Sequence, residues 1–425
     1  MSISSVMIKM KEKDRMNTEK KEKIICIGAG ASGLFFALNC ADDDHEVILI
    51  DGNAKAGRKM YISGKGRCNI TNDCEAQEFI NNVIRNPRFL YSAINRFKPA
   101  DTIAFFNEHE CPLKTERGNR VFPVSDKSAD IIDTLVRECR RKKVKLIFEE
   151  KAEKIEKTTE GFTVRCTDNE YTCDRLVIAT GGLSYPSTGS TGDGYEFARS
   201  FGHNIVELKS ALCPLRIREK INKDMYDLTL RNVTLTAAND HFRKSIFGDL
   251  EFLPGAITGP IALSMSSLIN REENIKLTLD LKPALDEEKL DRRLLRDIEK
   301  DPNKDVRFLL KGLLPEGFIQ FFLDNTATDP SIILNSMTKV MRKQLLNDLK
   351  HFRFDYISPE SVDKGIVTSG GIDVKQIDPK TMESKLCEGL YFIGEVLDVD
   401  AFTGGFNLQI ALSTAYSCAM GIKDQ

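Results

Sequence analysis

A glycine-rich turn near the start of the chain constrains the fold more than any other feature. The apolar run 24–27 leads into Gly28-Ala29-Gly30-Ala31-Ser32-Gly33, which has the pattern G-x-G-x-x-G, and an amphipathic helix is predicted from residue 34. A second apolar run, 46–50, ends in Asp51. This order of strand, glycine turn, helix, strand and acid is typical of a dinucleotide-binding βαβ unit.

Each glycine of the turn has a physical role in such a unit. Gly28 allows the tight turn, Gly30 lets the backbone approach a pyrophosphate, and Gly33 lets the helix pack closely on the strand. The N–H groups and the positive dipole end of the helix attract phosphates. Asp51 is placed to accept hydrogen bonds from ribose hydroxyls. In this context the turn indicates a bound dinucleotide rather than a tight turn without a ligand.

Composition limits the class of protein. A chain of 425 residues suggests two or three domains, and its net charge of −2 gives no overall field that favours nucleic acid or a membrane. No apolar run approaches the roughly 20 residues that span a bilayer. Eleven cysteines, an odd number without a C-x-x-C, indicate a reducing cytoplasm, and five separated histidines predict no metal site. We therefore expect a small-molecule substrate and no nucleic acid or membrane partner; the oligomeric state stays open.

The apolar pattern predicts an α/β fold: a Rossmann-like domain interrupted by an inserted β-barrel and a helical module. Residues 1–22 are expected to form a disordered leader, and 23–204 the first part of the Rossmann-like domain. Short alternating runs at 205–282 predict a small barrel or sandwich, and 283–350 has helical spacing. Residues 351–364 are a return strand of the insert, and 365–425 complete the first domain.

Two glycine-rich segments are candidates for ligand contact. The segment 57–69 carries four cations and several glycines, so it is predicted to be a loop along an anionic planar ligand and not a regular helix. A solvated basic loop is the alternative. Gly404 and Gly405 precede an apolar helix and predict a second anion-binding helix N-terminus, although a simple glycine entry to a helix is the plainer interpretation. A further helix at 127–141 is expected to be capped by Ser125 or Asp126.

Long sequence words in a fixed order resemble one family, the BaiN-like (also YhiN-like) NAD(P)/FAD-dependent oxidoreductases, distant kin of the fumarate-reductase and ketosteroid-dehydrogenase flavoproteins. The resemblance covers residues 22–422, and at 250–260 the chain departs from it, with Glu251 and no histidine. It implies a three-part plan of FAD domain, inserted β-barrel and helical module. The matching words lie at 57–59, 63–72, 120–123, 179–186, 189–195, 391–400 and 403–409.

The resemblance implies that the dinucleotide is FAD and assigns residues to each part of it. The implied contacts are Gly28, Ala29, Gly30, Ser32 and Gly33 at the pyrophosphate; Asp51 at the adenosine ribose; Ala152, through its backbone, at the adenine; Thr180, Gly181 and Gly182 on the adenosine side, supported by Asp193; Arg58, Lys59, Ser63, Gly64, Arg67, Cys68 and Asn69 along the ribityl chain and isoalloxazine; Gly394, Glu395 and Asp398 at the ribityl chain and phosphates; and Gly404, Gly405, Asn407 and Leu408 at the flavin pyrimidine edge.

The activity implied by the resemblance is reduction of a conjugated carbon–carbon double bond in a hydrophobic carbonyl substrate, steroid-like or bile-acid-like. The chain has no second G-x-G-x-x-G, so NAD(P)H is expected as a transient electron donor. Tyr185 and Arg120 are candidates for the catalytic proton donor and carbonyl contact, with Tyr61 and Arg117 beside them; a structural hydrogen bond is the alternative for each.

Two other classes of function stay open. The chain could be a flavin-dependent oxidase of a small amine or alcohol, or a flavin-bearing protein that binds or modifies RNA. Against RNA, the basic stretches 140–145 and 292–296 are short or interleaved with acids, which is typical of solvated faces.

Overall fold

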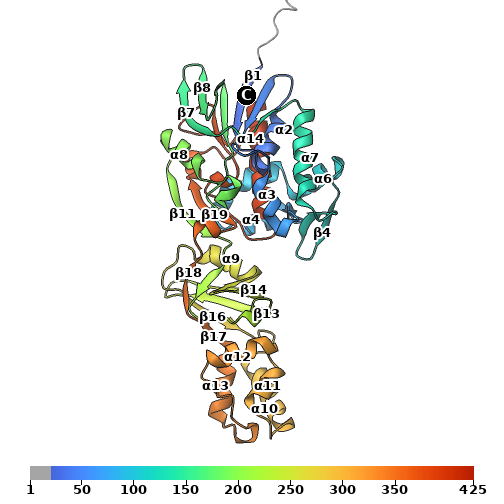
Figure 1. Cartoon of the computed structure of the whole chain (residues 1–425), viewed down its shortest axis with the longest axis vertical. Helices are drawn as coiled ribbons and strands as arrows, with labels where there is room; N and C mark the ends of the chain where they lie inside the picture. Colours follow the sequence, from blue (N-terminus) through green and yellow to red (C-terminus); the bar gives the residue numbers. More distant parts are fainter. Residues whose placement is uncertain (1–20) are drawn as a thin grey trace, which may run out of the picture.

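The computed structural model describes residues 21–425 and shows an elongated molecule, with a broad domain at one end and a narrower insert at the other (Figure 1). The first strand, β1 (Glu22–Ile27), begins at the start of the described chain. The leader expected at 1–22 therefore lies almost wholly outside the described residues.

A five-stranded parallel sheet forms the centre of the broad domain. Its order is β20-β10-β1-β2-β6, so that β20, from near the end of the chain, pairs with β10 one strand away from β1. The strands are apolar and mostly buried because helices and smaller sheets cover both faces. The remaining bounds are β2 (His45–Ile50), β6 (Lys145–Ile147), β10 (Arg175–Ile178) and β20 (Leu390–Phe392).

The helix after the glycine turn, α2 (Ala31–Cys40), is buried at nearly every position. It packs against α14 (Phe406–Lys423) and α7 (Ser128–Arg141) as well as the sheet. The amphipathic helix predicted there is thus enclosed on all sides, which its apolar face alone did not show. The helices α4 (Ala76–Asn81), α5 (Pro87–Arg96), α6 (Pro99–Glu108) and α8 (Asp193–Ser200) complete the domain.

Two three-stranded antiparallel sheets flank this core. One has the order β3-β5-β4, and the other, β7-β8-β9, contains the hairpin predicted at 162–173. The cap expected for α7 is wrong: its N-cap is Lys127, without a side-chain cap, because Asp126 is engaged in ion pairs instead. The strands are β3 (Thr71–Asn72), β4 (Leu113–Glu116), β5 (Arg120–Pro123), β7 (Ala152–Thr158), β8 (Gly161–Cys166) and β9 (Glu170–Cys173).

The insert is joined to the broad domain by the antiparallel pair β11 (Ile205–Ala211) and β19 (Val367–Ile372). It contains a seven-stranded sheet in the order β17-β16-β13-β14-β15-β12-β18. In the described residues β17 and β18 are its two edges and do not pair, so the predicted closed barrel is not confirmed. The strands are β12 (Leu215–Ile217), β13 (Thr229–Ala238), β14 (Arg243–Leu253), β15 (Ala256–Thr258), β16 (Lys276–Asp280), β17 (Phe352–Phe354) and β18 (Tyr356–Pro359).

Helices, rather than an opposite barrel wall, fill the inner face of the inserted sheet. Phe318 and Phe321 of α12 pack on Phe252 of β14, and Phe318 also meets Phe352 of β17. Sheet and helices thus share one hydrophobic core, separate from that of the broad domain. The helices are α9 (Pro260–Ile269), α10 (Glu287–Lys300), α11 (Val306–Lys311), α12 (Glu316–Asp324) and α13 (Lys339–Lys350).

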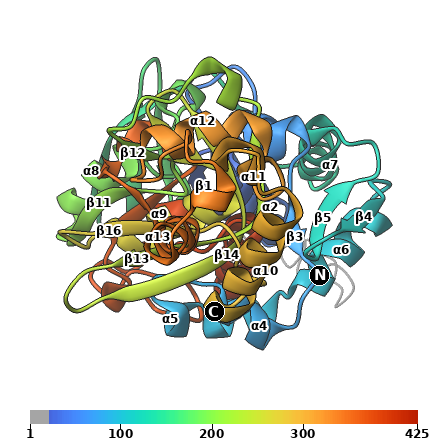
Figure 2. The same ribbon diagram turned by 90° about the horizontal axis from the view of Figure 1, so that it is seen from below.

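The helical end of the molecule forms as the spacing at 283–350 predicts. Figure 2 looks along the long axis from this end, with α10–α13 in front of the inserted sheet. Asp286, Asp305 and Thr338 each accept a hydrogen bond from a first-turn N–H and so start α10, α11 and α13. Within 21–425 no helix has both the length and the apolar character needed to cross a membrane.

Candidate functional site

The glycine turn and the C-terminal segment, far apart in sequence, lie side by side. Gly394 has φ +74°, and a Cβ added there would lie 2.7 Å from Ser32 Oγ at the start of α2. The backbone N–H of Gly394 donates to Thr414 Oγ1 of α14 at 3.1 Å. Since α14 also packs along α2, the two ends of the chain build one site.

The turn itself has the shape of a phosphate cradle. A Cβ at Gly33 would lie 1.8 Å from Gly28 O, and one at Gly28, where φ is +107°, would lie 2.4 Å from Ala179 O. At Gly30 an added Cβ meets nothing within 4 Å. Gly30 is also the N-cap of α2 and provides no side-chain cap, so the first-turn N–H groups are left for a ligand. Open space in front of a free helix N-terminus fits the pyrophosphate of FAD.

Asp51 supports the turn from the end of β2. Its Oδ2 accepts from Ala29 N at 2.7 Å, and its Oδ1 accepts from the backbone and side-chain nitrogens of Asn53 at 2.7 and 2.8 Å. A carboxylate offers about four acceptor sites, so Asp51 can still receive ribose hydroxyls.

The adenosine-side residues meet at the start of α8. Asp193 accepts from Thr191 Oγ1 at 2.8 Å and from Lys151 Nζ at 3.2 Å, and Lys151 directly precedes Ala152. Thr180 Oγ1 is buried and has no hydrogen-bond partner among the described residues. A Cβ at Gly194 would lie 2.1 Å from that hydroxyl, so the structure keeps Thr180 against the uncapped start of α8. An unpaired buried hydroxyl is what a bound ligand would satisfy.

The glycine- and cation-rich segment is not wholly a loop. Residues Arg58–Ile62 form the short helix α3, which corrects the prediction that no regular helix forms there. It follows Gly57, whose φ is +70°, and gives way to the kinked 3₁₀ turn Ser63–Gly66 because Gly64 and Lys65 both have left-handed backbone angles.

Three side chains of this segment that were assigned to the cofactor interact with the protein itself or are buried in it. The Arg67 guanidinium binds Glu116 and Asp126 and lies 4.1 Å from the centre of the Phe122 ring. Asn69 Oδ1 accepts from Val121 N at 3.2 Å. Cys68 is fully buried, and burial raises the pKa of its thiol to about 12. Arg58, by contrast, is exposed and donates to Asn53 Oδ1 at 2.7 Å.

Lys59 and Glu395 form the central contact of the site. Lys59 Nζ lies 2.7 and 2.9 Å from the two carboxylate oxygens of Glu395 and donates to Ser184 Oγ at 2.6 Å. Glu395 Oε1 also accepts from Thr368 N at 2.9 Å, and a Cβ at Gly182 would lie 3.2 Å from it. The sequence predicted Lys59, Gly182 and Glu395 one by one. Their pairing, and the roles of Ser184 and Thr368, have no local signal because the partners lie on four separate segments.

The start of α14 is anchored to the β3 segment. A Cβ at Gly405, where φ is +98°, would lie 2.2 Å from Thr71 O, and Gly404 O accepts from Asn72 Nδ2 at 3.0 Å. Gly405 gives α14 no side-chain cap, so this N-terminus too is free for a ligand. The Asn407 side chain holds its own loop by bonds of 3.0 and 2.9 Å to Ala401 N and O, next to the half-buried Leu408.

A charged cluster, absent from the sequence-based site except for Asp398, borders this segment. Arg85 forms two bonds of 2.6 Å with the Asp398 carboxylate, and Asn86 Nδ2 donates to Asp398 Oδ2 at 2.9 Å. Asp400 is fully buried, and neither carboxyl oxygen has a hydrogen-bond partner in the described chain. Burial, chiefly, raises the pKa of Asp400 to about 7. Within 21–425 no three His, Cys, Asp or Glu side chains are grouped to hold a metal ion.

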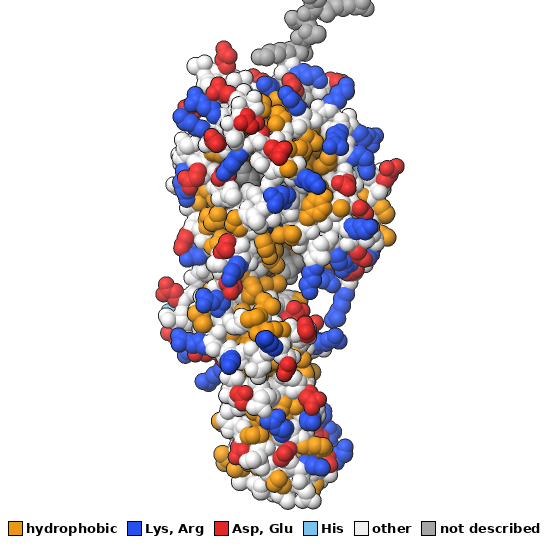
Figure 3. All heavy atoms as spheres, in the orientation of Figure 1, with side chains coloured by type: hydrophobic (Ala, Val, Ile, Leu, Met, Phe, Trp, Pro, Cys, Tyr) orange, Lys and Arg blue, Asp and Glu red, His pale blue; other side chains and the backbone are white. Residues whose placement is uncertain are grey.

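The two candidate catalytic residues are not brought together by hydrogen bonds in the described residues. Tyr185 is half-buried, with φ +53°, and its N–H donates to Asp363 O at 3.0 Å. Arg120 is exposed and its Nε donates to Arg117 O at 3.1 Å. Tyr61 and Ile62 of α3 are 38% and 47% exposed. In the view of Figure 3, apolar side chains gather along the middle of the visible face, from the broad domain onto the insert.

Comparisons with known proteins show the family of the chain. Residues 22–421 match the family described as HI0933-like protein Rossmann domain. The chain is 32% identical over 409 residues to the ribosomal RNA dihydrouridine synthase of Haemophilus influenzae, covering 94% of this chain and 98% of that protein. It is 26% identical over 400 residues to the 3-dehydro-bile acid delta(4,6)-reductase of Clostridium scindens, covering 93% and 97%.

A solved structure supports the fold. The 3-ketosteroid-delta4-(5alpha)-dehydrogenase of Rhodococcus jostii superposes with a TM-score of 0.52 at 11% identity, covering 97% of this chain and 99% of that one. The family match spans nearly the whole described chain, and in the fold the glycine turn lies beside the C-terminal segment, with α2 and α14 both starting at a glycine that gives no side-chain cap. The chain therefore belongs to the HI0933-like Rossmann flavoprotein family, the BaiN-like FAD-dependent oxidoreductases that its sequence words resemble.

Proposed function

We propose that the protein is an NAD(P)H-driven, FAD-dependent reductase of a carbon–carbon double bond conjugated to a carbonyl, and that its substrate is a uracil base in RNA. The observation that carries the RNA assignment is the 32% identity to a ribosomal RNA dihydrouridine synthase over almost the full length of both chains. This substrate departs from the sequence-based expectation of a small molecule and no nucleic acid.

The two relatives' names describe the same chemical step. Dihydrouridine is uridine whose C5=C6 bond, conjugated to the C4 carbonyl, has gained two hydrogens. A 3-oxo steroid with double bonds at positions 4 and 6 is likewise a conjugated enone. In both cases a hydride is added to one carbon and a proton to its neighbour; FAD that has been reduced by NAD(P)H would supply the hydride. The chemistry predicted from the resemblance is therefore common to both, and the substrates differ.

The chain's own residues supply three things to such a step. The uncapped α14 N-terminus at Gly405 would stabilise negative charge on a flavin bound in front of it, by about 0.3–1 kcal/mol if exposed and more if dry. The ion pair of Lys59 and Glu395 fixes α3 against the C-terminal segment and so orients the site. Asp400 holds a proton close to neutral pH, whereas Asp398 is already bound by Arg85.

A second candidate substrate is a steroid-like enone. The bile-acid reductase favours it, at 26% identity over 93% of this chain. The apolar side chains on the face in Figure 3 are compatible with a hydrophobic ligand, although they would also support a stacked base.

One anaerobic experiment tests both candidates. The FAD-loaded protein is titrated with NADH and with NADPH, and bleaching of the flavin absorbance identifies the donor. The reduced protein is then mixed with ribosomal RNA transcribed in vitro or with a 3-oxo-4,6-diene steroid. Mass spectrometry of the digested RNA detects a gain of two hydrogens on a uridine. Loss of the dienone's ultraviolet absorbance band measures its reduction.

Each result distinguishes between the candidate functions. A uridine that gains two hydrogens only when NAD(P)H is present supports the RNA proposal. Reduction of the dienone alone supports the second candidate. Peroxide formation in air with an amine or alcohol, without NAD(P)H oxidation, would support an oxidase and refute both. A flavin that neither nicotinamide bleaches refutes the proposed donor.

A further inference from the structure

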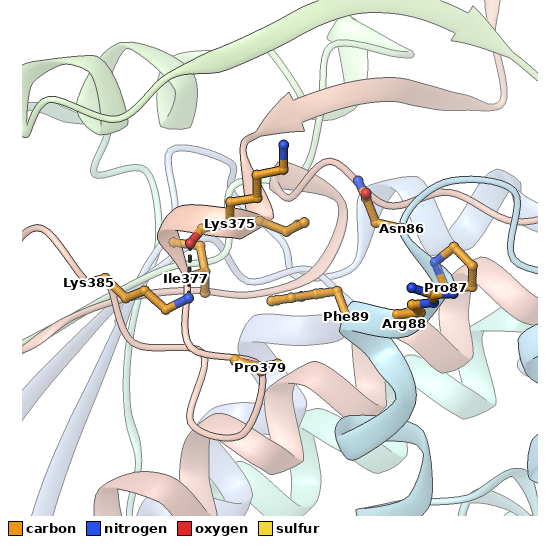
Figure 4. A pocket seen from close by; sticks show the side chains of 9 residues that line it. Asn86, Pro87, Arg88, Phe89, Lys375, Ile377, Pro379 and Lys385 are labelled. Atoms are coloured by element: carbon orange, nitrogen blue, oxygen red, sulfur yellow. Dashed lines mark hydrogen bonds between the residues drawn. The ribbon is translucent and has the colours of Figure 1, made fainter.

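A cavity of about 480 Å³, wide open at the protein surface, lies beside the site, between the start of α5 and the segment 374–385 (Figure 4). Phe89 and Ile377 point toward each other across it, and Lys375 and Lys385 lie on the opposite side from Asn86, Pro87 and Arg88. No group of the flavin site described above fills it.

The residues that line the cavity carry three positive charges and no negative charge. Arg88, Lys375 and Lys385 line it and are exposed, and no Asp or Glu is among the lining residues. In the described part of the chain none of the three forms an ion pair; Lys385 Nζ donates instead to Lys375 O at 2.9 Å. Three like charges around a concavity raise the local positive potential, and this favours an anion.

The floor of the same cavity is apolar. Phe89 and Val374 are 9% and 7% exposed and offer carbon surface at its base, beside the fully buried Ile377. A bare inorganic anion would leave this floor uncovered, and a hydrocarbon would leave the cations unpaired. A planar ring that carries a phosphate satisfies both, because ring faces pack on apolar side chains and phosphates bind Arg and Lys. The N-terminus of α5, with Pro87 at its first position, adds positive dipole charge.

The cavity is connected to the flavin site by one residue. Asn86, which lines it, donates to both Asp398 O at 2.6 Å and Asp398 Oδ2 at 2.9 Å, and the adjacent Arg85 pairs with the same carboxylate. A ligand held here would therefore lie next to the segment 394–400 that the flavin site uses.

We propose that this cavity binds a phosphorylated nucleotide, with the phosphate between Arg88 and Lys375 and the ring over Phe89. The proposal rests on the proposed function for the source of that nucleotide: a nucleotide of the RNA substrate that flanks the reduced uridine, or the 2′-phosphorylated half of NADPH. The chemistry recognised is the same in both cases, and the experiment below separates them.

The test uses the full-length protein loaded with FAD. The double variant Arg88→Ala/Lys375→Ala removes two rim charges, and Lys380→Ala is the matched control, because Lys380 is an exposed lysine of the same segment that does not line the cavity. Fluorescence anisotropy measures binding of a labelled uridine-containing RNA hairpin without any reductant. Anaerobic flavin bleaching measures the half-saturating NADPH and NADH concentrations. Thermal unfolding confirms that the variants fold.

We expect the double variant to raise either the Kd for RNA or the half-saturating NADPH concentration by about tenfold. Lys380→Ala should change the same quantity less than about twofold. For RNA, the slope of log Kd against log salt should also fall by about two, one for each lost cation. Weaker RNA binding assigns the cavity to the RNA chain. Weaker NADPH use with unchanged NADH use assigns it to the 2′-phosphate.

Both of those outcomes support a nucleotide site. The proposal is overturned if the double variant matches Lys380→Ala in both assays, or if the wild-type protein binds neither probe. The RNA arm involves no turnover, so it can succeed even if no uridine is reduced. The absence of nucleotide binding in the cavity can therefore be distinguished from the absence of the proposed reductase activity.

Discussion

Asp400 offers the sharpest test of the electrostatics of the site. It is fully buried, its two carboxyl oxygens lack hydrogen-bond partners in the described residues, and its pKa is raised from an ordinary 3.8 to about 7. Burial is the largest cause, because removing a carboxylate from water disfavours its charged form. The variant that tests this is Asp400→Asn, which keeps the shape of the side chain and removes its titration.

The sign and size of the effect follow from the raised pKa. Between 3.8 and about 7 the folded protein keeps a proton that the unfolded chain has released, so stability falls as the pH rises through this window. The full cost of ionising Asp400 is about 4 kcal/mol and is reached above about pH 7. Between about pH 5 and about pH 8 the wild-type protein should lose about 2–3 kcal/mol of unfolding free energy relative to Asp400→Asn.

Urea denaturation of both proteins at several pH values, with the same FAD loading, measures this difference. Replacing the carboxyl group by an amide also changes the hydrogen bonding in a way that does not depend on pH, and this shifts the variant's curve without changing its slope. The readout is therefore the pH dependence of the difference and not its absolute size. Parallel stability curves for the two proteins would refute the reasoning, because they would mean that Asp400 titrates in the folded state as it does in the unfolded chain.

Three further predictions concern groups of the flavin site. Gly30→Ala should fold normally but retain less FAD, because an added Cβ enters the open space in front of the turn. Gly33→Ala should lower the free energy of unfolding by several kcal/mol, because its Cβ would lie 1.8 Å from Gly28 O. Flavin absorbance after gel filtration measures the first effect and thermal unfolding the second. Lys59→Met should cost about 1–2 kcal/mol in urea unfolding, and Glu395→Gln in the same background should recover part of it; additive costs would show that the pair does not couple. Asp398→Asn should cost about 3 kcal/mol because it leaves the Arg85 charge unpaired, and an unchanged urea midpoint would contradict this.

Much of the broad domain and the helices of the insert could be predicted from the sequence because their signals are local. The glycine turn, the acid after β2, the hairpin at 162–173 and the helices of 283–350 each depend on a short stretch of residues. Gly28 was predicted to allow the tight turn and Gly33 to let the helix pack closely on the strand, and in the structure neither position has room for a Cβ.

Other features of the site depended on contacts between distant segments. Lys59 and Glu395 were both predicted to bind the cofactor, yet only the folded chain pairs them with each other, and it turns the Arg67 charge toward Glu116 and Asp126. Likewise, alternation in the insert predicted strands but could not show whether their edges meet, since the helices that fill the sheet come from a later segment.

The sequence by itself therefore determined the strand, the glycine turn and the helix of a dinucleotide-binding fold, because those residues are neighbours along the chain. Only the tertiary structure decided which charges are neutralised and which are left unpaired. The burial of Asp400 and the unpaired rim of Arg88 and Lys375 depend on segments that meet only after folding, and desolvation and ion pairing act through space rather than along the chain.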